Sequence, residues 1–229
     1  MLRFMNKPGF AMLMIALCAL PFQADAGAWP RERGKTFVSS SASARWPDQR
    51  PLELPDIYGS VYVEHGLGAR ITLGLDVGSS DATRKDRLKT VAFLRYTLTP
   101  SSSQHQVAFD IGGGTHRGAD VLRLGASYGT GFTSFERNSW LSLDAHILAK
   151  TEIADVSLAV DATYGISFKR GKLMTQVSGF KSFDGTQTLT FTPSYAHNIG
   201  QGRHIEIGVN IDLQNTPDPT LKIGIWQEF

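Results

Sequence analysis

The nine residues "LKIGIWQEF" (Leu221–Phe229) alternate strictly between two kinds of side chain. The odd positions read Leu221, Ile223, Ile225, Gln227 and Phe229, and the even positions read Lys222, Gly224, Trp226 and Glu228. A period of two is typical of a β-strand whose two faces meet different environments. Such a strand fits a soluble sandwich, where the apolar face turns inward, and also a membrane barrel, where the apolar face meets lipid.

The same alternation runs through most of the chain after residue 26. It is clearest in "IEIGVNIDL" (205–213) and "ITLGLDVG" (71–78), and turn signals such as "IGQGR" and "NTPDP" separate the runs. The pattern predicts about twelve strands, near residues 35–42, 57–65, 70–78, 89–98, 105–112, 120–128, 139–148, 155–165, 172–181, 187–196, 204–213 and 220–229. Ten strands is the alternative, because the first, second and ninth alternate poorly.

Residues 1–26 have the three-part layout of a secretory signal peptide. Arg3 and Lys7 precede the apolar run "FAMLMIALCAL" (10–20), and "ADA" (24–26) is a cleavage site of the small-x-small type. The run is too short to span a bilayer as a helix. The sequence therefore predicts an exported protein whose mature chain starts at Gly27.

Composition excludes several functions. The formal net charge is +2, which gives no basic footprint for nucleic acid. The one cysteine, Cys18, lies in the predicted signal peptide, so the mature chain has no disulfide and no thiolate metal site. We expect no cofactor, no metal site and no nucleic-acid partner.

Three features favour a membrane barrel over a sandwich. The polar faces carry small polar residues in strand after strand, as a lumen requires. If the first strand runs outward, most inner turns are short and the two longest connections lie outside. Aromatic residues also recur on the apolar face near the ends of the strands that return to the periplasm, which predicts an interfacial girdle of Tyr96, Tyr128, Tyr164, Tyr195 and Phe229.

The last strand resembles a known pattern. Gram-negative outer-membrane β-barrels typically end in a strand with a terminal Phe and apolar residues at alternate positions, which the barrel-assembly machinery reads. Phe229, Ile225, Ile223 and Leu221 match this pattern, and Gln227 departs from it. The lead-in "GAWPRERGKTF" (27–37) with this ending also resembles a proteobacterial group of outer-membrane proteins. These resemblances imply a location and an architecture, and they imply no chemistry.

The polar faces supply a set of candidate lumen residues. Opposite charges across a narrow barrel either pair with one another or line a water path that selects among solutes. The acidic excess favours cations. The predicted lumen-lining residues are Asp76, Arg95, Asp110, Arg123, Asp144, His146, Asp161, Glu206, Asn210, Asp212, Lys222 and Glu228.

Two alternatives remain open at the level of sequence. A barrel enzyme acting on lipid or peptide would need a histidine base within hydrogen-bond reach of a nucleophile. The mature chain offers His65, His105, His116, His146, His197 and His204, none of them in a recognised catalytic spacing. The other alternative is a soluble periplasmic β-sandwich that binds a ligand.

We therefore expect residues 27–229 to form an all-β, transmembrane, antiparallel up-and-down barrel in the bacterial outer membrane. The function that fits this pattern is a porin-like channel or a structural barrel with a polar, charged lumen. No catalytic residue is assigned. The expected partners are outer-membrane lipid, the barrel-assembly machinery through the last strand, and small solutes.

Overall fold

A computed structural model describes residues 27–46, 54–81, 83–153, 155–214 and 219–229. Within them the chain is almost entirely β-strand, with one 3-10 turn, η1 (Lys85–Arg87). The strands are β1 (Thr36–Arg45), β2 (Asp56–Gly66), β3 (Ile71–Ser79), β4 (Leu88–Thr97), β5 (His105–His116), β6 (Ala119–Ser134), β7 (Arg137–Lys150), β8 (Val156–Phe168), β9 (Gly171–Lys181), β10 (Gln187–Gly200), β11 (Arg203–Asp212) and β12 (Thr220–Glu228). No helix in the described ranges is long and apolar enough to cross a membrane.

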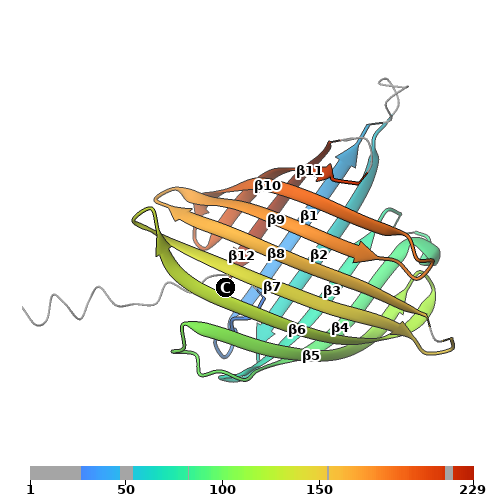
Figure 1. Cartoon of the computed structure of the whole chain (residues 1–229), viewed down its shortest axis with the longest axis horizontal. Helices are drawn as coiled ribbons and strands as arrows, with labels where there is room; N and C mark the ends of the chain where they lie inside the picture. The colour runs from blue at the N-terminus through green and yellow to red at the C-terminus, as the bar shows by residue number, and fades with distance from the viewer. Residues whose placement is uncertain (1–26, 47–53, 82, 154, 215–218) are drawn as a thin grey trace, which may run out of the picture.

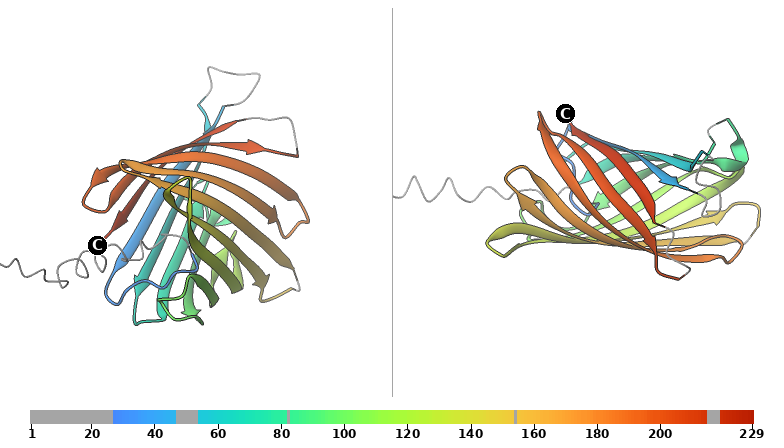
Figure 2. Two further views of the ribbon diagram at one scale, coloured as in Figure 1. Left: turned by 60° about the vertical axis from the view of Figure 1, so that its left-hand side comes forward. Right: turned by 90° about the horizontal axis from the view of Figure 1, so that it is seen from above.

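The twelve strands close into one barrel. Each strand pairs antiparallel with its sequence neighbour, and β1 pairs with β12 to complete the ring (Figure 1). In Figure 2 the strands of one wall cross those of the opposite wall at a steep angle, as the tilt of a closed barrel requires. The expected twelve-stranded antiparallel barrel is confirmed, and the ten-stranded and β-sandwich alternatives are wrong.

The alternation seen in the sequence separates the outside of the barrel from its interior. In β12, Ile223 and Ile225 are about half exposed on the outer face, whereas Lys222 and Trp226 line the interior. The outer face is apolar around the ring, with exposed Leu73, Leu94, Ile111, Leu124, Leu143, Leu158, Leu173, Tyr195 and Ile207 on successive strands from β3 to β11. Apolar side chains on this scale mark a surface that meets another apolar phase.

The poorly alternating first strand is held by its pairing. The β1 sequence TFVSSSASAR turns Phe37, Ser39 and Ser41 toward the interior, and the opposite face carries only small apolar or hydroxyl residues. Ten residue pairs with β2 and eight with β12 fix β1 in place. Backbone hydrogen bonds supply order where the hydrophobic pattern is weak.

The barrel has two distinct ends. The terminal end, where β1 begins and β12 finishes, also carries the connections 67–70, 98–104, 135–136, 169–170 and 201–202. The far end carries 46–55, 80–87, 117–118, 151–155, 182–186 and 213–219. The two longest connections lie together at the far end, as expected. The 98–104 connection departs from the expectation of short turns at the terminal end.

Three of the four two-residue turns, 117–118, 135–136 and 201–202, have left-handed backbone at both positions. Arg117 and Gly118 have φ of 54° and 81°, and Gln201 and Gly202 have φ of 54° and 71°. Two successive residues with positive φ match the right-handed twist of the strands that they join. Glycine at the second position adopts this conformation without a steric penalty.

The segment before β1, residues 27–35, enters the barrel at the terminal end. Its base is tied to β2 by hydrogen bonds from Gly34 N to Gly66 O and from Gly66 N to Lys35 O, at 2.8 and 2.9 Å. Ala28 is fully buried, and the Trp29 ring packs against a cluster of interior side chains. We call residues 27–35 the amino-terminal segment. It narrows the interior from one end.

Candidate functional site: the lumen

The barrel encloses a cavity of about 990 Å³. Its lining comes from β1 to β12, from the amino-terminal segment and from η1, so it follows the interior from one end of the barrel toward the other. A barrel of about eight strands is filled by its own side chains, whereas twelve strands leave internal space. The cavity is therefore a property of the strand number, and its side chains decide what the space accepts.

The wall formed by β2 to β6 carries a network of alternating charges. Glu64 on β2 accepts from Arg31 Nε at 2.8 Å, from Tyr62 OH at 2.7 Å and from Arg95 Nη1. Arg95 lies 3.9 Å from Asp110. The network continues through Arg123, Asp76 and Lys89, with Arg123 Nε 2.6 Å from Asp110, Arg123 Nη1 3.7 Å from Asp76 and Lys89 Nζ 2.8 Å from Asp76.

Phe93 sets the spacing of this network. Its ring is almost fully buried, and the guanidinium carbons of Arg123 and Arg95 lie 4.5 and 5.2 Å from its centroid. A Cβ on Gly74 of β3 would lie 2.0 Å from the ring, so glycine provides the room for it. A cation over an aromatic face is stabilised by the ring quadrupole. Both arginines are thus held against the wall.

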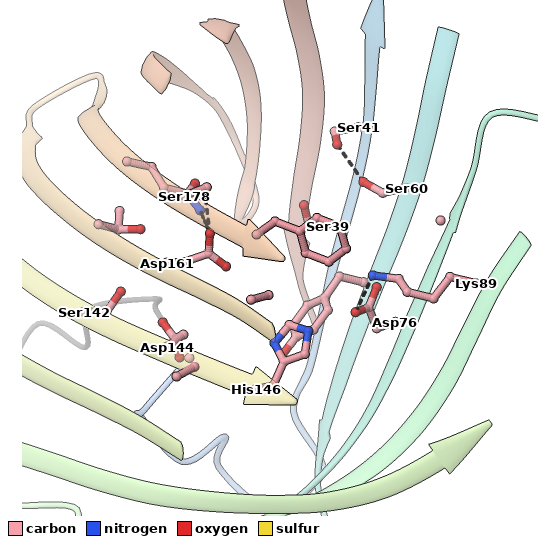
Figure 3. A pocket seen from close by; sticks show the side chains of 18 of the residues that line it. Ser39, Ser41, Ser60, Asp76, Lys89, Ser142, Asp144, His146, Asp161 and Ser178 are labelled. Atoms are coloured by element: carbon pink, nitrogen blue, oxygen red, sulfur yellow. Dashed lines mark hydrogen bonds and ion pairs between the residues drawn. The ribbon is translucent and has the colours of Figure 1, made fainter. Parts of the chain in front are cut away.

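The opposite wall, β7 to β10, is chemically different. Asp144 on β7 and Asp161 on β8 are direct cross-strand partners that both face the cavity, as Figure 3 shows. Asp161 accepts hydrogen bonds from Gln176 Nε2 at 3.0 Å and Ser178 Oγ at 2.5 Å, which are neutral groups. Neither aspartate forms an ion pair with another described residue of the interior. These two carboxylates therefore face the cavity without a direct counterion among the described residues.

Aromatic side chains fill the terminal end of the lumen. Trp29 and Trp226 pack against Trp140, Met174 and Ala196. Additional contacts hold this group in place. The Trp226 indole N–H donates to Glu206 at 3.1 Å, and Lys222 Nζ lies 2.9 Å from the same carboxylate. The Lys172 ammonium lies 5.7 and 5.9 Å from the centroids of the Trp140 and Trp226 rings. The interior is therefore amphipathic at this end.

A second apolar cluster lies near the far end. Val91, Val121 and Leu148 point inward, and Phe183 from the 182–186 connection packs on them, 5.4 Å from the His116 ring. At the same mouth, η1 brings Asp86 into the lining. Arg84 donates to Asp86 at 3.1 and 2.8 Å and holds the pKa of that carboxyl below its ordinary value.

The structure places the predicted lumen residues as follows. Eight of them line the cavity: Asp76, Arg95, Arg123, Asp144, His146, Asp161, Glu206 and Lys222. Asp110 is buried behind the lining in the charge network, and Asn210 bridges Thr192 and Ser43 at 2.9 and 3.2 Å. Asp212 ends β11 and accepts from the backbone N–H of Gln214, and Glu228 pairs with Arg31 at the terminal rim.

Sequence reasoning missed several partners of these residues. Glu64, Lys89 and Arg31 complete the charge network, and Phe93 separates its arginines. Phe93 shares a strand face with Arg95, so strand parity was a signal that could have placed it inside. Arg31 lies outside every strand, and no periodic pattern pointed to it.

The predicted girdle residues lie on the outer face in the terminal half of the barrel. Tyr96, Tyr195 and Phe229 are between 40% and 56% exposed, and Tyr128 and Tyr164 are partly exposed. Other aromatic residues accompany them there: Phe109, Phe132 and Phe168. Phe132 stacks on Tyr164 with a centroid distance of 6.1 Å.

The histidine contacts do not assemble a nucleophile with a base. His65 hydrogen-bonds to Thr36 Oγ1 and His105 to the Tyr128 hydroxyl, both at 2.8 Å. The rings of His116, His197 and His204 lie against Phe183, Tyr195 and Trp226. His146 lines the cavity. In the part of the chain that the structure describes, no group of three or more His, Cys, Asp or Glu residues is arranged to hold a metal ion.

Arg95 is the residue on which the charge network depends. We expect Arg95→Met to lower the free energy of unfolding by about 1–3 kcal/mol, because Glu64 loses a buried charged hydrogen bond and Asp110 a nearby cation, while Arg31 and Arg123 remain beside them. Urea titration of the barrel in detergent, followed by tryptophan fluorescence, measures this. Arg70→Met, at an exposed turn, is the matched control. A loss of less than about 1 kcal/mol at Arg95, as for a surface pair, would contradict the assignment.

The fold is that of outer-membrane porins and channels. The chain is similar to the COG4313 outer membrane channel from Pseudomonas putida F1, with a TM-score of 0.55 and 14% identity over 90% of this chain and all of that one. It is also similar to the KdgM porin, with a TM-score of 0.56 and 10% identity over 83% of this chain and 99% of that one. A structure of the KdgM porin in complex with disordered oligogalacturonate gives a TM-score of 0.58 at 9% identity. No protein-family model and no curated protein matches the sequence.

Proposed function

We propose that this chain is an outer-membrane, porin-like channel for small hydrophilic solutes, narrowed at the terminal end by its own amino-terminal segment. The observation that carries the proposal is the cavity of about 990 Å³, lined by charged and hydroxyl side chains inside a closed barrel. Water occupies such a space readily, and a hydrated lumen surrounded by an apolar outer face is the construction of a pore. The fold neighbours support the same reading.

The proposed location rests on the outer surface and the two ends. The apolar outer face fits lipid, and the aromatic residues of the terminal half fit a membrane interface. We propose that the terminal end faces the periplasm, because the longest connections lie at the far end. Phe229 and the apolar positions before it would then be read by the barrel-assembly machinery. The resemblance to a proteobacterial group of outer-membrane proteins agrees with this location.

The charge balance of the lumen suggests a preference for cations. On the β2–β6 wall every guanidinium and ammonium of the network has a carboxylate partner, so the charges largely cancel. On the β7–β10 wall Asp144 and Asp161 face the cavity without an ion-pair partner among the described residues. Rings or pairs of uncancelled carboxylates raise the local concentration of cations. An acidic sugar chain, of the kind that the KdgM porin is seen to bind, would meet repulsion at this wall.

Single-channel recording in planar bilayers tests the proposal. We expect discrete current steps from the purified, folded protein, and a reversal potential in a salt gradient that indicates cation preference. Asp161→Asn should move that potential toward zero, since a unit charge about 4 Å from an ion in water is worth about 1 kcal/mol, or a factor of about five in occupancy.

Asp155→Asn removes the same charge from the far-end connection and is the control. It should leave the reversal potential nearly unchanged. A folded barrel that never conducts would refute the proposed channel. An anion preference measured for the wild-type protein would refute the proposed cation selectivity.

A further inference from the structure

The first described residue, Gly27, is held inside the lumen. Its carbonyl oxygen accepts a hydrogen bond from Arg95 Nη1, and the next residue, Ala28, is fully buried. A Cβ on Gly27 would lie 2.2 Å from Asp144 Oδ1, so the backbone of residue 27 runs directly against the carboxylate and leaves no room for a side chain. The backbone nitrogen of Gly27 is bonded, at about 1.46 Å, to the Cα that would carry this Cβ, so the nitrogen also lies beside the carboxylate.

The carboxylate at this contact has no direct ion-pair partner among the described residues; it accepts hydrogen bonds from Ser127 and Ser142, and Arg95 is the cation that acts on it from farther away. Asp144 faces Asp161 across the β7–β8 pairing, and within the described residues it forms no ion pair of 4.0 Å or less. Two carboxylates side by side in a partly enclosed space are costly unless a positive group joins them. The backbone of Gly27, which lies against Asp144, carries no charge as long as its nitrogen is part of a peptide bond.

Removal of the predicted signal peptide changes that nitrogen. Hydrolysis of the Ala26–Gly27 peptide bond by a signal peptidase consumes one water and leaves a carboxylate on Ala26 and an ammonium on Gly27. We infer that the α-ammonium created at Gly27 by this cleavage pairs with Asp144 inside the lumen and anchors the amino-terminal segment there. An amide at the same position carries no charge, so the unprocessed chain lacks this ion pair.

The inference also explains the residue at position 27. A new terminus that pairs with Asp144 requires a residue without a Cβ, and the chain supplies glycine. The further contacts of the segment bring it to this point: Trp29 lies against Gly129 of β6, and Arg31 binds Glu64 and Glu228. The inference rests on the predicted cleavage and on the barrel. The ion pair does not require the barrel to conduct ions, so a barrel without conductance would leave the inference intact.

Acylation of the α-amine tests the ion pair. An N-hydroxysuccinimide ester at pH 7 reacts with the neutral α-amine in preference to lysine, whose ammonium titrates near 10.4. Mass spectrometry of the tryptic peptide 27–31 reports the rate. We expect the folded mature protein to react at least about tenfold more slowly than the urea-unfolded protein, because the ion pair holds the amine as ammonium.

Two variants separate the ion pair from simple burial. Asp144→Asn should restore most of the acylation rate of the unfolded protein. Gly27→Ala should also restore it, with the Asp144 carboxylate still present, because the Cβ added at position 27 would displace the terminus. Asp155→Asn should behave as wild type. Retained heat-modifiable migration on gels shows that each variant is folded. Rapid acylation of the wild type, equal protection in Asp144→Asn, or a mature chain that starts at another residue would overturn the inference.

Discussion

Deletion of residues 27–33 is expected to raise the single-channel conductance at least about threefold, because Gly27, Ala28 and Trp29 lie in the lumen of a barrel that is otherwise wide enough for water. The deletion removes Trp29 from the aromatic group at the terminal end and Arg31 from Glu64. It places Gly34 directly after Ala26, so a small residue still follows the predicted cleavage site. Arg95 continues to neutralise Glu64, and the strands are untouched.

A pair of point variants refines this experiment. Arg31→Ala removes the ion pairs with Glu64 and Glu228, and it should produce current that switches between the wild-type level and the higher level of the deletion. Arg33→Ala, an exposed arginine of the same segment, changes the same charge without losing such contacts and should conduct as wild type does. Equal conductance of wild type and deletion would show that the amino-terminal segment does not limit the pore.

Much of this architecture was predictable because strand alternation is a local property of the sequence. The period of two assigns each residue to a face as soon as one residue of the strand is assigned. Placing Tyr96 outside and Arg95 inside therefore determined the faces of β4 as a whole. The same reasoning identified the outer face of β12, where Ile223 and Ile225 are exposed.

The interior partners were harder to predict because they depend on register and on side-chain size. Glu64, Arg95 and Asp110 meet across three strands, and a shift of register by two residues would separate them without changing any face. Phe93 and Trp140 are apolar residues on lumen faces, where a polar side chain is the default expectation. Only Gly74 and Gly165, which make room for these rings, hint at them in the sequence.

The amino-terminal segment shows a different limit. Residues 27–35 have no periodic pattern, and in the sequence they read as a polar lead-in that contains a proline. Their position in the lumen follows from contacts with β2, β4 and β7 that lie between about 30 and 120 residues away. Such contacts are visible only once the barrel has closed. This is why the part of the lumen that most directly controls its width was absent from the sequence-based prediction.

Loss of the terminal aromatic residue should impair assembly far more than stability. The Phe229 side chain is 56% exposed, and its backbone pairs with Thr36 through hydrogen bonds of 2.9 and 3.2 Å. Deletion of Phe229 removes both, whereas Phe229→Ala keeps the backbone pair. If the assembly machinery buries this ring, either change costs about 1.5–3 kcal/mol of recognition, which corresponds to about tenfold or more in binding. We therefore expect about tenfold less folded barrel in the outer membrane.

Tyr195→Ala is the matched control, because Tyr195 is an outer-face aromatic of the terminal half with 40% exposure and lies on β10, outside the last strand. Membrane fractionation followed by heat-modifiable gel migration measures assembly in cells, and urea unfolding of refolded protein measures stability. Phe229→Ala and Tyr195→Ala should have similar stabilities, because each removes one half-exposed ring from the lipid face. Only Phe229→Ala should lower the amount of assembled barrel. Equal assembly of the two variants would mean that Phe229 is an interfacial residue like the others, without a separate role in recognition.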